Sequence, residues 1–403
     1  MKGMENIMEN KYLSERVKPL KASAIREMFK LMADPEIISL AGGSPAPELF
    51  PGEELSKIAG KILMTNPKAA LQYGTTDGYA PLKELVKKRV EKINSIHEGD
   101  KILITTGAQQ GIDLAAKILV NDEESVVVEA PSFVGTLNSL RSYRAKLIGV
   151  PLDNDGMNME KLEEALSQNK VKLIYTIPTF QNPAGITMSL EKRKKMLELA
   201  KKYDTIIIED NPYGDLRFEG EDVPTIKSLD TEGRVIYVGT FSKILSPGMR
   251  IGYTVANEEF SDRIEVVKQV NDVHTPLLTQ IMAAEFMKKF DIDKLIEKER
   301  ELYGRKCRFM LSCIDKYFPK SVSYTRPEGG IFILCTAPEG TDTNELLKKS
   351  LKYKVAFVPG NSFSTEIEKP SNLFRLNYST MPEERIEKGI EALGRVLSEE
   401  LGK

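Results

Sequence analysis

The sequence has few of the residues from which disulfide and metal sites are built. It contains three cysteines, no Cys-x-x-Cys pair, and two histidines, His97 and His274. This set does not fit a disulfide framework or a thiolate zinc site, and it excludes a metal site made of several histidines. A Ser–His–Asp triad would have to use one of these two histidines, and the Gly-x-Ser-x-Gly motif that often presents such a serine is absent.

Long apolar runs and an excess of either charge are also missing. The 57 Lys and Arg residues nearly balance the 59 Asp and Glu residues, so no overall positive field attracts nucleic acid. No apolar stretch approaches the roughly 18 residues that span a membrane, and residues 1–13 do not resemble a signal sequence. We expect a protein of the reducing cytoplasm with neither a nucleic-acid nor a membrane partner.

The middle of the chain alternates short β-rich runs with amphipathic helical patterns. We expect strands at 101–105, 125–129, 146–150, 172–176, 205–209, 235–239 and 251–256, and helices at 109–119, 135–143, 159–167 and 190–203. Apolar strands separated by helices indicate a mostly parallel sheet that is covered on both faces. Such sheets bind ligands at the carboxyl ends of their strands, so the strand-to-helix junctions form the candidate site.

The last third of the chain predicts a second, smaller α+β domain. We expect an antiparallel pair at 322–325 and 330–335, a helix at 343–353, strands at 355–358 and 374–378, and a helix at 383–401. A helical pattern at 22–33, ahead of the sheet, indicates that the small domain is discontinuous. The predicted units are an N-terminal segment and helix that pack with the small domain (1–45), a large domain (46–290) and the small C-terminal domain (291–403).

The junction after strand 235–239 carries the most specific motif, in which Thr240, Ser242 and Lys243 are followed by Arg250 beyond a Pro-Gly turn. An ammonium group directly after a buried strand is costly unless it loses its proton or reacts. Such an amine is suited to covalent capture of an aldehyde. The neighbouring hydroxyl and guanidinium groups supply donors for a phosphate. The alternative is a surface lysine beside a turn.

Two further junctions carry groups that suit a heteroaromatic ring. After strand 205–209, Asp210 can keep a ring nitrogen protonated and Tyr213 can bond to a ring oxygen, although this spacing alone is typical of a turn. After strand 172–176, the Gln-Asn-Pro-Ala-Gly motif also favours a turn. Its functional interpretation is that Asn182 presents its amide to an oxygen of a ring or substrate.

The junction after strand 101–105 has the features of an anion site. Gly107 permits a tight turn, and the backbone amides of Ala108 and Gln109 open the next helix, where unpaired N–H groups attract anions. The same residues equally fit an ordinary helix start. The glycine-rich fingerprints of dinucleotide and nucleoside triphosphate sites are absent.

Together the junctions describe a site for pyridoxal 5′-phosphate: a phosphate cradle, a reactive lysine, an acid for a ring nitrogen and donors for a ring oxygen. With these motifs the chain resembles the fold-type I pyridoxal-phosphate enzymes, the aspartate-aminotransferase-like superfamily, from about residue 22 to the last helix. It is most similar to the 2-aminoadipate and kynurenine/2-aminoadipate aminotransferase subgroup. Further matching stretches are Leu40–Gly43, Leu71–Tyr73 and Phe374–Leu376.

The resemblance implies an α/β fold-type I transferase whose large domain binds the cofactor. It implies that Lys243 carries the cofactor and acts as general acid and base, and that Asp210 pairs with the ring nitrogen. Tyr213 and Asn182 would bond to the ring oxygen, and Phe133 would stack on the ring where many relatives have a tyrosine. The phosphate ligands it implies are Gly107, Ala108, Gln109, Thr240, Ser242, Arg250 and, from the neighbouring subunit of a homodimer, Tyr73.

The resemblance also implies residues that bind the substrate. Arg375 would clamp the α-carboxylate, helped by Asn182 and by the backbone near Gly43. On the N-terminal helix Arg26, beside Ser23, matches a position where an arginine of aminoadipate-type relatives meets a distal carboxylate. Our hypothesis is that Arg26 favours glutamate or 2-aminoadipate and moves aside for apolar or aromatic side chains; the alternative is a solvated helix residue.

These features predict a pyridoxal-phosphate-dependent aminotransferase with a ping-pong mechanism. It would move an amino group between an L-amino acid (glutamate, 2-aminoadipate, leucine or an aromatic amino acid) and a 2-oxo acid such as 2-oxoglutarate. A β-lyase or decarboxylase on the same fold stays an alternative, although Arg375, by holding a carboxylate that is retained, favours transamination. A regulator with an aminotransferase-like body would need a DNA-binding module of about 60 to 70 residues, and only about 20 precede the family-like region.

Overall fold

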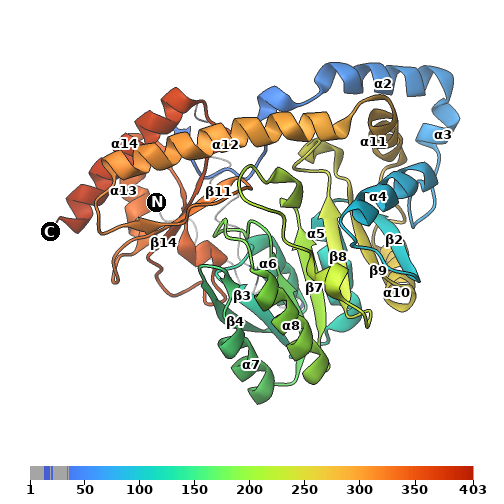
Figure 1. Ribbon diagram of the computed structural model, residues 1–403, viewed down its shortest axis with the longest axis horizontal. Coiled ribbons are helices and arrows are strands. Elements are labelled where there is room, and N and C mark those ends of the chain that lie inside the picture. The colour runs from blue at the N-terminus through green and yellow to red at the C-terminus, as the bar shows by residue number, and fades with distance from the viewer. Residues whose placement is uncertain (1–12, 19, 21–33, 35, 403) are drawn as a thin grey trace.

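The computed structural model describes residues 13–18, 20, 34 and 36–402, and its centre is an eight-stranded sheet (Figure 1). The helix predicted at 22–33 lies outside the described residues. The strand order is β2-β9-β8-β7-β6-β3-β4-β5. The bounds are β2 (Asp100–Thr105), β3 (Ser125–Ala130), β4 (Lys146–Asp153), β5 (Gly156–Met157), β6 (Val171–Thr176), β7 (Ile206–Asn211), β8 (Val235–Thr240) and β9 (Gly252–Asn257).

The strands from β4 through β3, β6 and β7 to β8 are all parallel. β9 runs antiparallel between β8 and β2, and β5 runs antiparallel to β4 at the other edge. The predicted mostly parallel sheet is therefore confirmed. Each strand predicted for this part of the chain is present with its ends displaced by at most a few residues, whereas the two-residue β5 was not predicted.

Helices cover both faces of this sheet. α5 (Ala108–Leu119), α6 (Val134–Ser142) and α10 (Glu258–Asn271) pack on one face, and α7 (Met159–Gln168), α8 (Leu190–Lys202) and α9 (Ile226–Leu229) pack on the other. Side chains of a strand alternate between the two faces. In β3, Val126 and Val128 therefore join the core under α5, and Val127 joins the core under α8.

Several helices lie in stretches for which the sequence analysis made no prediction. α2 (Gly52–Thr65), α3 (Pro67–Leu71), α4 (Ala80–Lys92) and α11 (Leu277–Lys289) gather at one end of the sheet (Figure 1). α11 is buried around most of its circumference and so lacks a clear polar stripe, which makes it hard to recognise by periodicity. α12 (Ile292–Tyr317) has 26 residues and runs from this end to the smaller domain.

The smaller domain contains an antiparallel sheet with the order β10-β11-β14-β13. Its elements are β10 (Ser323–Tyr324), β11 (Phe332–Thr336), α13 (Thr343–Ser350), β13 (Val358–Pro359), β14 (Leu373–Asn377) and α14 (Glu383–Leu401). The predicted antiparallel pair and final helix are confirmed. None of the helices in the described part of the chain combines the length and apolar character that a bilayer span requires.

The single strand predicted at 355–358 is wrong, because the chain changes partner at Phe357. β12 (Val355–Ala356) pairs in parallel with β1 (Ile38–Ser39), whereas β13 joins the antiparallel sheet. The Phe357 ring is fully buried, with its centroid 5.1 Å from that of Phe374, and this packing fixes the residue between β12 and β13. β1 thus ties the N-terminal segment to the C-terminal part. The division of the chain at residues 45 and 290 stays a prediction.

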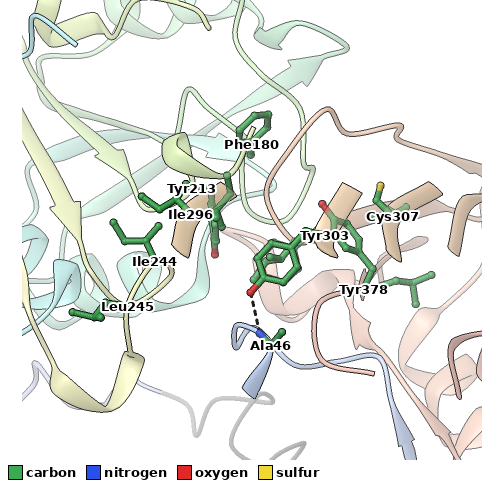
Figure 2. Close-up of a cluster of buried hydrophobic side chains, with 14 of the residues drawn as sticks. Ala46, Phe180, Tyr213, Ile244, Leu245, Ile296, Tyr303, Cys307 and Tyr378 are labelled. Atoms are coloured by element: carbon green, nitrogen blue, oxygen red, sulfur yellow. Dashed lines mark hydrogen bonds between the residues drawn. The ribbon is translucent and has the colours of Figure 1, made fainter. Parts of the chain in front are cut away.

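A hydrophobic core lies under α12, where the two domains meet (Figure 2). Tyr303 of α12 accepts a hydrogen bond from the backbone N–H of Ala46 at 2.9 Å. Cys307 and Tyr378 lie on the side of the smaller domain, and Tyr213 and Ile244 come from the larger one. This bond fixes the N-terminal segment at Ala46 against α12.

One buried cation connects two loops at the carboxyl side of the large sheet. Arg193 of α8 is fully buried, and burial lowers its pKa to about 10. Its guanidinium group donates at 2.8–3.4 Å to five oxygen atoms, those of the Pro178, Met188, Val223 and Pro224 carbonyls and the Thr179 hydroxyl. Because the five N–H groups of arginine all find acceptors, the loop after β6 is held to the loop before α9.

We predict that Arg193→Met destabilises the fold by about 3 kcal/mol, because it leaves several buried oxygens without a donor. Lys194→Met is the matched control, since Lys194 is half-exposed and pairs with Glu191 within one helical turn. It should change stability by less than about 0.5 kcal/mol. Urea unfolding of the two variants measures both effects, and equal stabilities would contradict this role of Arg193.

Candidate active site

A cavity of about 280 Å³ lies at the carboxyl ends of β6, β7 and β8. Its position agrees with the junctions chosen from the sequence. The fold brings together residues from both ends of the chain, and the cavity is lined by Gly43, Ser44, Ala108, Gln109, Ile112, Phe133, Ile177, Asn182, Asp210, Pro212, Tyr213, Thr240, Ser242, Lys243, Pro247, Arg250, Phe332 and Arg375.

The amine of Lys243 projects into this cavity directly after β8. Its Nζ donates to the carbonyl oxygen of Gly43 at 2.6 Å and lies 5.8 Å from the centre of the Tyr213 ring. Burial lowers the pKa of Lys243 to about 8, and the positive charges of Arg375 and Arg250 act in the same direction. A lysine with this pKa has a substantial neutral fraction near physiological pH and is a competent nucleophile.

Asp210 lies near the end of β7 and is 3% exposed. Its Oδ2 accepts a hydrogen bond from the hydroxyl of Tyr175 in β6 at 2.8 Å, whereas its Oδ1 has no partner. Burial raises the pKa of Asp210 to about 7, while the Tyr175 hydrogen bond and the charge of Lys243 oppose this rise. An unpartnered buried carboxylate oxygen in a cavity fits a ligand that brings its own N–H donor.

Arg375 enters the cavity from β14 of the smaller domain. Its Nη1 donates to Asn182 Oδ1 at 2.8 Å, and its Nη2 donates to the carbonyl oxygen of Ala41 at 2.9 Å. The guanidinium carbon lies 4.0 Å from the centre of the Phe332 ring, and Nε has no partner. Burial lowers the pKa of Arg375 to about 10, a value at which it is still a cation at neutral pH. It can therefore bind a carboxylate.

The start of α5 and Arg250 form a cradle that only glycine permits. Gly107 has a φ of 78°, and a Cβ atom there would lie 2.3 Å from Nη2 of Arg250. A Cβ atom on Gly252 would lie 2.5 Å from the carbonyl carbon of Gly107. Arg250 donates to the carbonyl oxygen of Thr106 at 3.1 Å. The N-terminus of α5 and this guanidinium group together suit a phosphate.

The two hydroxyl groups predicted for this cradle also lie together. Thr240 Oγ1 donates to Ser242 Oγ at 3.0 Å, and both residues are buried at the cavity wall. Gln109 lines the same wall, where its Nε2 donates to the carbonyl oxygen of Gly135 at 3.3 Å. The ring of Phe133 lines the cavity as well. The residues predicted to bind the phosphate and to stack on the ring thus lie together around this cavity, with the exception of Tyr73.

Tyr73 is not among the residues that line the described cavity of its own chain. Its side chain is exposed, with 79% of the residue surface accessible, and its ring lies edge-on to that of His274 at 5.8 Å. Ser23 and Arg26, the two predicted substrate residues of the N-terminal helix, lie outside the described residues.

Glu129, at the end of β3, is a residue that the sequence analysis missed. It is 1% exposed and accepts hydrogen bonds from Thr176 Oγ1 at 2.6 Å, from Gln181 Nε2 at 2.9 Å and from the Ile177 backbone N–H at 3.3 Å. Burial raises its pKa to about 7. These bonds fix the loop that presents Asn182. An acidic residue ending an otherwise apolar predicted strand is the signal that could have indicated it.

The model of the family Aminotransferase class I and II matches residues 52–393. The chain belongs to this family. Aromatic-amino-acid aminotransferase 1 of Thermococcus litoralis is 44% identical over 98% of this chain and 95% of its own length. The 2-aminoadipate transaminase of Thermus thermophilus is 38% identical over 94% of each chain. Family membership confirms the aminotransferase activity that the motifs predicted.

Solved structures give the same assignment. The kynurenine aminotransferase of Pyrococcus horikoshii, solved with PMP, superimposes with a TM-score of 0.93 at 42% identity and covers 97% of this chain and 98% of its own. An α-aminoadipate aminotransferase of Thermus thermophilus, solved with N-(5′-phosphopyridoxyl)-L-leucine, gives 0.90 at 36% identity, with 97% and 98% covered. Together with the family membership, these structures show that the present protein uses pyridoxal 5′-phosphate as its cofactor. The unpartnered Asp210 Oδ1 and the cradle at Gly107 fit that cofactor.

In the apoprotein, the pH dependence of the free energy of unfolding should report the raised pKa of the buried acid Asp210. The pKa of Asp210 rises from 3.8 to about 7 on folding, so its stabilising contribution is present below pH 4 and is lost as the pH rises through 7. Asp210→Asn removes this loss. Relative to the wild type, the apo variant should gain about 4 kcal/mol of stability between pH 4 and pH 8.

Thermal and urea unfolding of the apoproteins at several pH values measure this gain. Asp153→Asn is the control, because Lys192 lowers the pKa of exposed Asp153 and the difference should slope weakly in the opposite direction. A pH-independent difference for Asp210→Asn would show that this carboxyl group titrates normally.

Proposed function

We propose that this aminotransferase accepts glutamate, 2-aminoadipate, leucine and aromatic amino acids as donors and a 2-oxo acid such as 2-oxoglutarate as acceptor. The observation that carries the proposal is the position of Arg375, a buried cation in the same cavity as the Lys243 amine. Every amino acid and 2-oxo acid of the set has the carboxylate that this cation can bind. The names of the relatives, which include aromatic-amino-acid and 2-aminoadipate aminotransferases, support this range.

The proposed chemistry needs one reactive amine that can gain and lose a proton. Bound pyridoxal phosphate supplies an aldehyde and a ring that accepts electrons. Lys243, with its lowered pKa, is the amine that would hold the aldehyde carbon and, once displaced, would take the Cα proton of the amino acid as general base and deliver it to that cofactor carbon as general acid. Asp210, through its unpartnered Oδ1, would pair with the ring nitrogen and keep it protonated. These steps return the enzyme to its starting form only after a 2-oxo acid has accepted the amino group, which is a ping-pong sequence.

The remaining predicted residues would orient the cofactor and the substrate. Asn182 and Tyr213 would bond to the ring oxygen, and Phe133 would cover one face of the ring. Arg375, with the backbone near Gly43, would fix the α-carboxylate. The phosphate would be bound by Gly107, Ala108, Gln109, Thr240, Ser242 and Arg250. Aromatic and aliphatic surfaces, such as Phe332 and Ile112, border the same cavity and suit an apolar substrate side chain.

Acidic donors need a further cation, and we assign this role to Arg26 with Ser23 beside it. The assignment rests on the sequence resemblance, because both residues lie outside the described part of the chain. Among the described lining residues, the cations are Lys243, Arg250 and Arg375, and each already has a role in the proposal. A distal carboxylate without a partner of its own would be disfavoured in a cavity with aromatic walls.

A panel of amino donors tests the substrate proposal. Each donor alone should convert the cofactor from its aldehyde to its amine form, and absorbance spectroscopy records the rate of this first half-reaction. In Arg26→Ala, we expect KM for glutamate and 2-aminoadipate to rise about tenfold or more and KM for leucine to stay within about twofold, because one charge-assisted bond is lost. Equal losses for acidic and apolar donors would refute the role of Arg26.

We further propose that the enzyme is a homodimer in which Tyr73 reaches the phosphate of the partner's site. The exposed Tyr73 ring lies beyond α3, close in the chain to the exposed apolar residues Leu63, Met64 and Leu71. Val270 of α10, close in sequence to His274, is 81% exposed. Exposed apolar residues of this kind support an interface between copies.

Subunit mixing distinguishes a shared site from a self-contained one. Lys243→Ala and Tyr73→Ala homodimers should each have low activity. If Tyr73 acts across the interface, a mixed dimer of these two variants has one site with both substitutions and one site with neither. Mixing should then restore activity at the second site. A dimer of Lys243→Ala with Lys243→Met is the control and should stay inactive. Absence of recovery from mixed dimers that have been isolated by a tag on each subunit contradicts the proposal.

A further inference from the structure

The phenol of Tyr175 is directed at the acid of the active site from within the sheet. Tyr175 is fully buried in β6, and its hydroxyl donates to Asp210 Oδ2 at 2.8 Å. β6 and β7 are adjacent and parallel, with Tyr175 opposite Ile208. Because side chains alternate along a strand, Asp210 lies on the same face as Ile208, two residues further towards the cavity. The register of the two strands therefore makes this contact.

Tyr175 is the one hydrogen-bond donor to Asp210 that the described residues provide. The charged and titratable groups around Asp210 are Lys243 after β8, Glu129 at the end of β3 and Tyr213 after β7. Lys243 favours the ionised acid, whereas Glu129 and Tyr213, when ionised, oppose it. None of these three replaces a hydrogen bond to the carboxylate.

The hydrogen bond has an electrostatic and a geometric consequence. A donor to a carboxylate stabilises the charged form, which the dry surroundings of Asp210 otherwise disfavour. It also occupies Oδ2, so that Oδ1, which has no partner, is the oxygen left for a ligand. An ionised acid with one free oxygen in a fixed position is what a protonated ring nitrogen needs.

We propose that Tyr175 is a positioning residue for the transamination: its phenol keeps Asp210 ionised and turns Oδ1 towards the ring nitrogen of the cofactor, so that this nitrogen stays protonated. The inference rests on the proposed function, in which Asp210 meets the ring nitrogen. It adds a residue of β6 that does not line the cavity and acts through another side chain.

The chain provides a matched control in the same sheet. Tyr237 of β8 is 2% exposed, and its hydroxyl accepts a hydrogen bond from Asn211 Nδ2 at 2.9 Å. Asn211 directly follows Asp210, so its side chain lies on the opposite face of β7. Tyr237 borders a different cavity of about 340 Å³ on that face. Tyr237→Phe therefore removes a buried tyrosine hydroxyl without touching Asp210.

The first test measures Asp210 in the apoprotein. Infrared spectra of protein with isotope-labelled aspartate, recorded across pH, follow the protonated carboxyl group. In Tyr175→Phe the pKa of Asp210 should rise above its wild-type value, whereas Tyr237→Phe should leave it unchanged. Placing a fluorinated tyrosine at position 175 should lower that pKa, because a more acidic phenol is a stronger donor and keeps the shape of the side chain. This second variant keeps the test valid should Tyr175→Phe fold poorly.

The second test measures the bound cofactor. In Tyr175→Phe the resonance of an isotope-labelled ring nitrogen should move towards its unprotonated position, and the dissociation constant of pyridoxal phosphate should rise about ten- to hundredfold. kcat should fall by a similar factor while KM for glutamate changes by less than about threefold. Tyr237→Phe should retain wild-type values for the nitrogen resonance and for kcat.

Two results would overturn the role of Tyr175: unchanged carboxyl and nitrogen signals in Tyr175→Phe, or equal changes in both phenylalanine variants, which indicate loss of packing alone. Borohydride reduction separates this failure from that of the proposed function. If reduction attaches the cofactor to Lys243 and the donor half-reaction proceeds, the proposed function stands without Tyr175. If the wild type does not bind the cofactor at Lys243, the proposed function itself is wrong.

Discussion

The site depends on one amine and one acid that share a cavity which disfavours the charge of each. Burial brings the pKa of Lys243 down to about 8 and that of Asp210 up to about 7, so both groups titrate near neutral pH. Each also stabilises the charged form of the other. The charge of Arg375 favours the neutral amine of Lys243, whereas the hydrogen bond from Tyr175 favours the carboxylate of Asp210. The surroundings thus separate the two groups into a nucleophile and an anion, which are the states that the proposed chemistry requires.

The loop after β6 can present Asn182 accurately because buried charges hold it from two sides. Glu129 accepts hydrogen bonds from Thr176, from Ile177 and from Gln181, at the start of the loop and beside Asn182. Arg193 donates to Pro178 and Thr179, between them. Glu129 thus binds N–H and O–H donors of this loop, and Arg193 binds its oxygen acceptors. Removing either side chain would leave its partners in the loop unpaired and would cost positional accuracy as well as stability.

The sequence predicts those parts of the fold and site in which the signal lies within a single segment. Apolar runs indicated the parallel strands, and Lys243, Asp210 and Asn182 were found because each follows such a run. Tyr175 was missed because its role comes from the register between strands, which no single segment contains. Glu129 left a local signal, an acid at the end of an apolar run, but its hydrogen-bond partners lie on β6 and in the loop that follows. The division of 355–358 depends on Phe357 packing against Phe374, some distance along the chain. Arg375 was assigned through resemblance, and its bond to the Ala41 carbonyl joins opposite ends of the sequence.

Residues 40–43 connect the two domains at the cavity, and this connection couples the two ends of a substrate site. The Leu40 N–H donates to the Ala356 carbonyl oxygen at 2.8 Å, which fixes the segment to the smaller domain. The next carbonyl oxygens accept from the site cations, Ala41 from Arg375 at 2.9 Å and Gly43 from Lys243 at 2.6 Å. A ligand that engages both cations competes with these two bonds. Because a carboxylate accepts more strongly than a carbonyl oxygen, an α-carboxylate at Arg375 competes with the bond to Ala41. The bond from Lys243 to Gly43 competes instead with the cofactor, whose aldehyde this amine would hold. One short stretch of backbone therefore borders both the carboxylate-binding end and the amine end of the cavity.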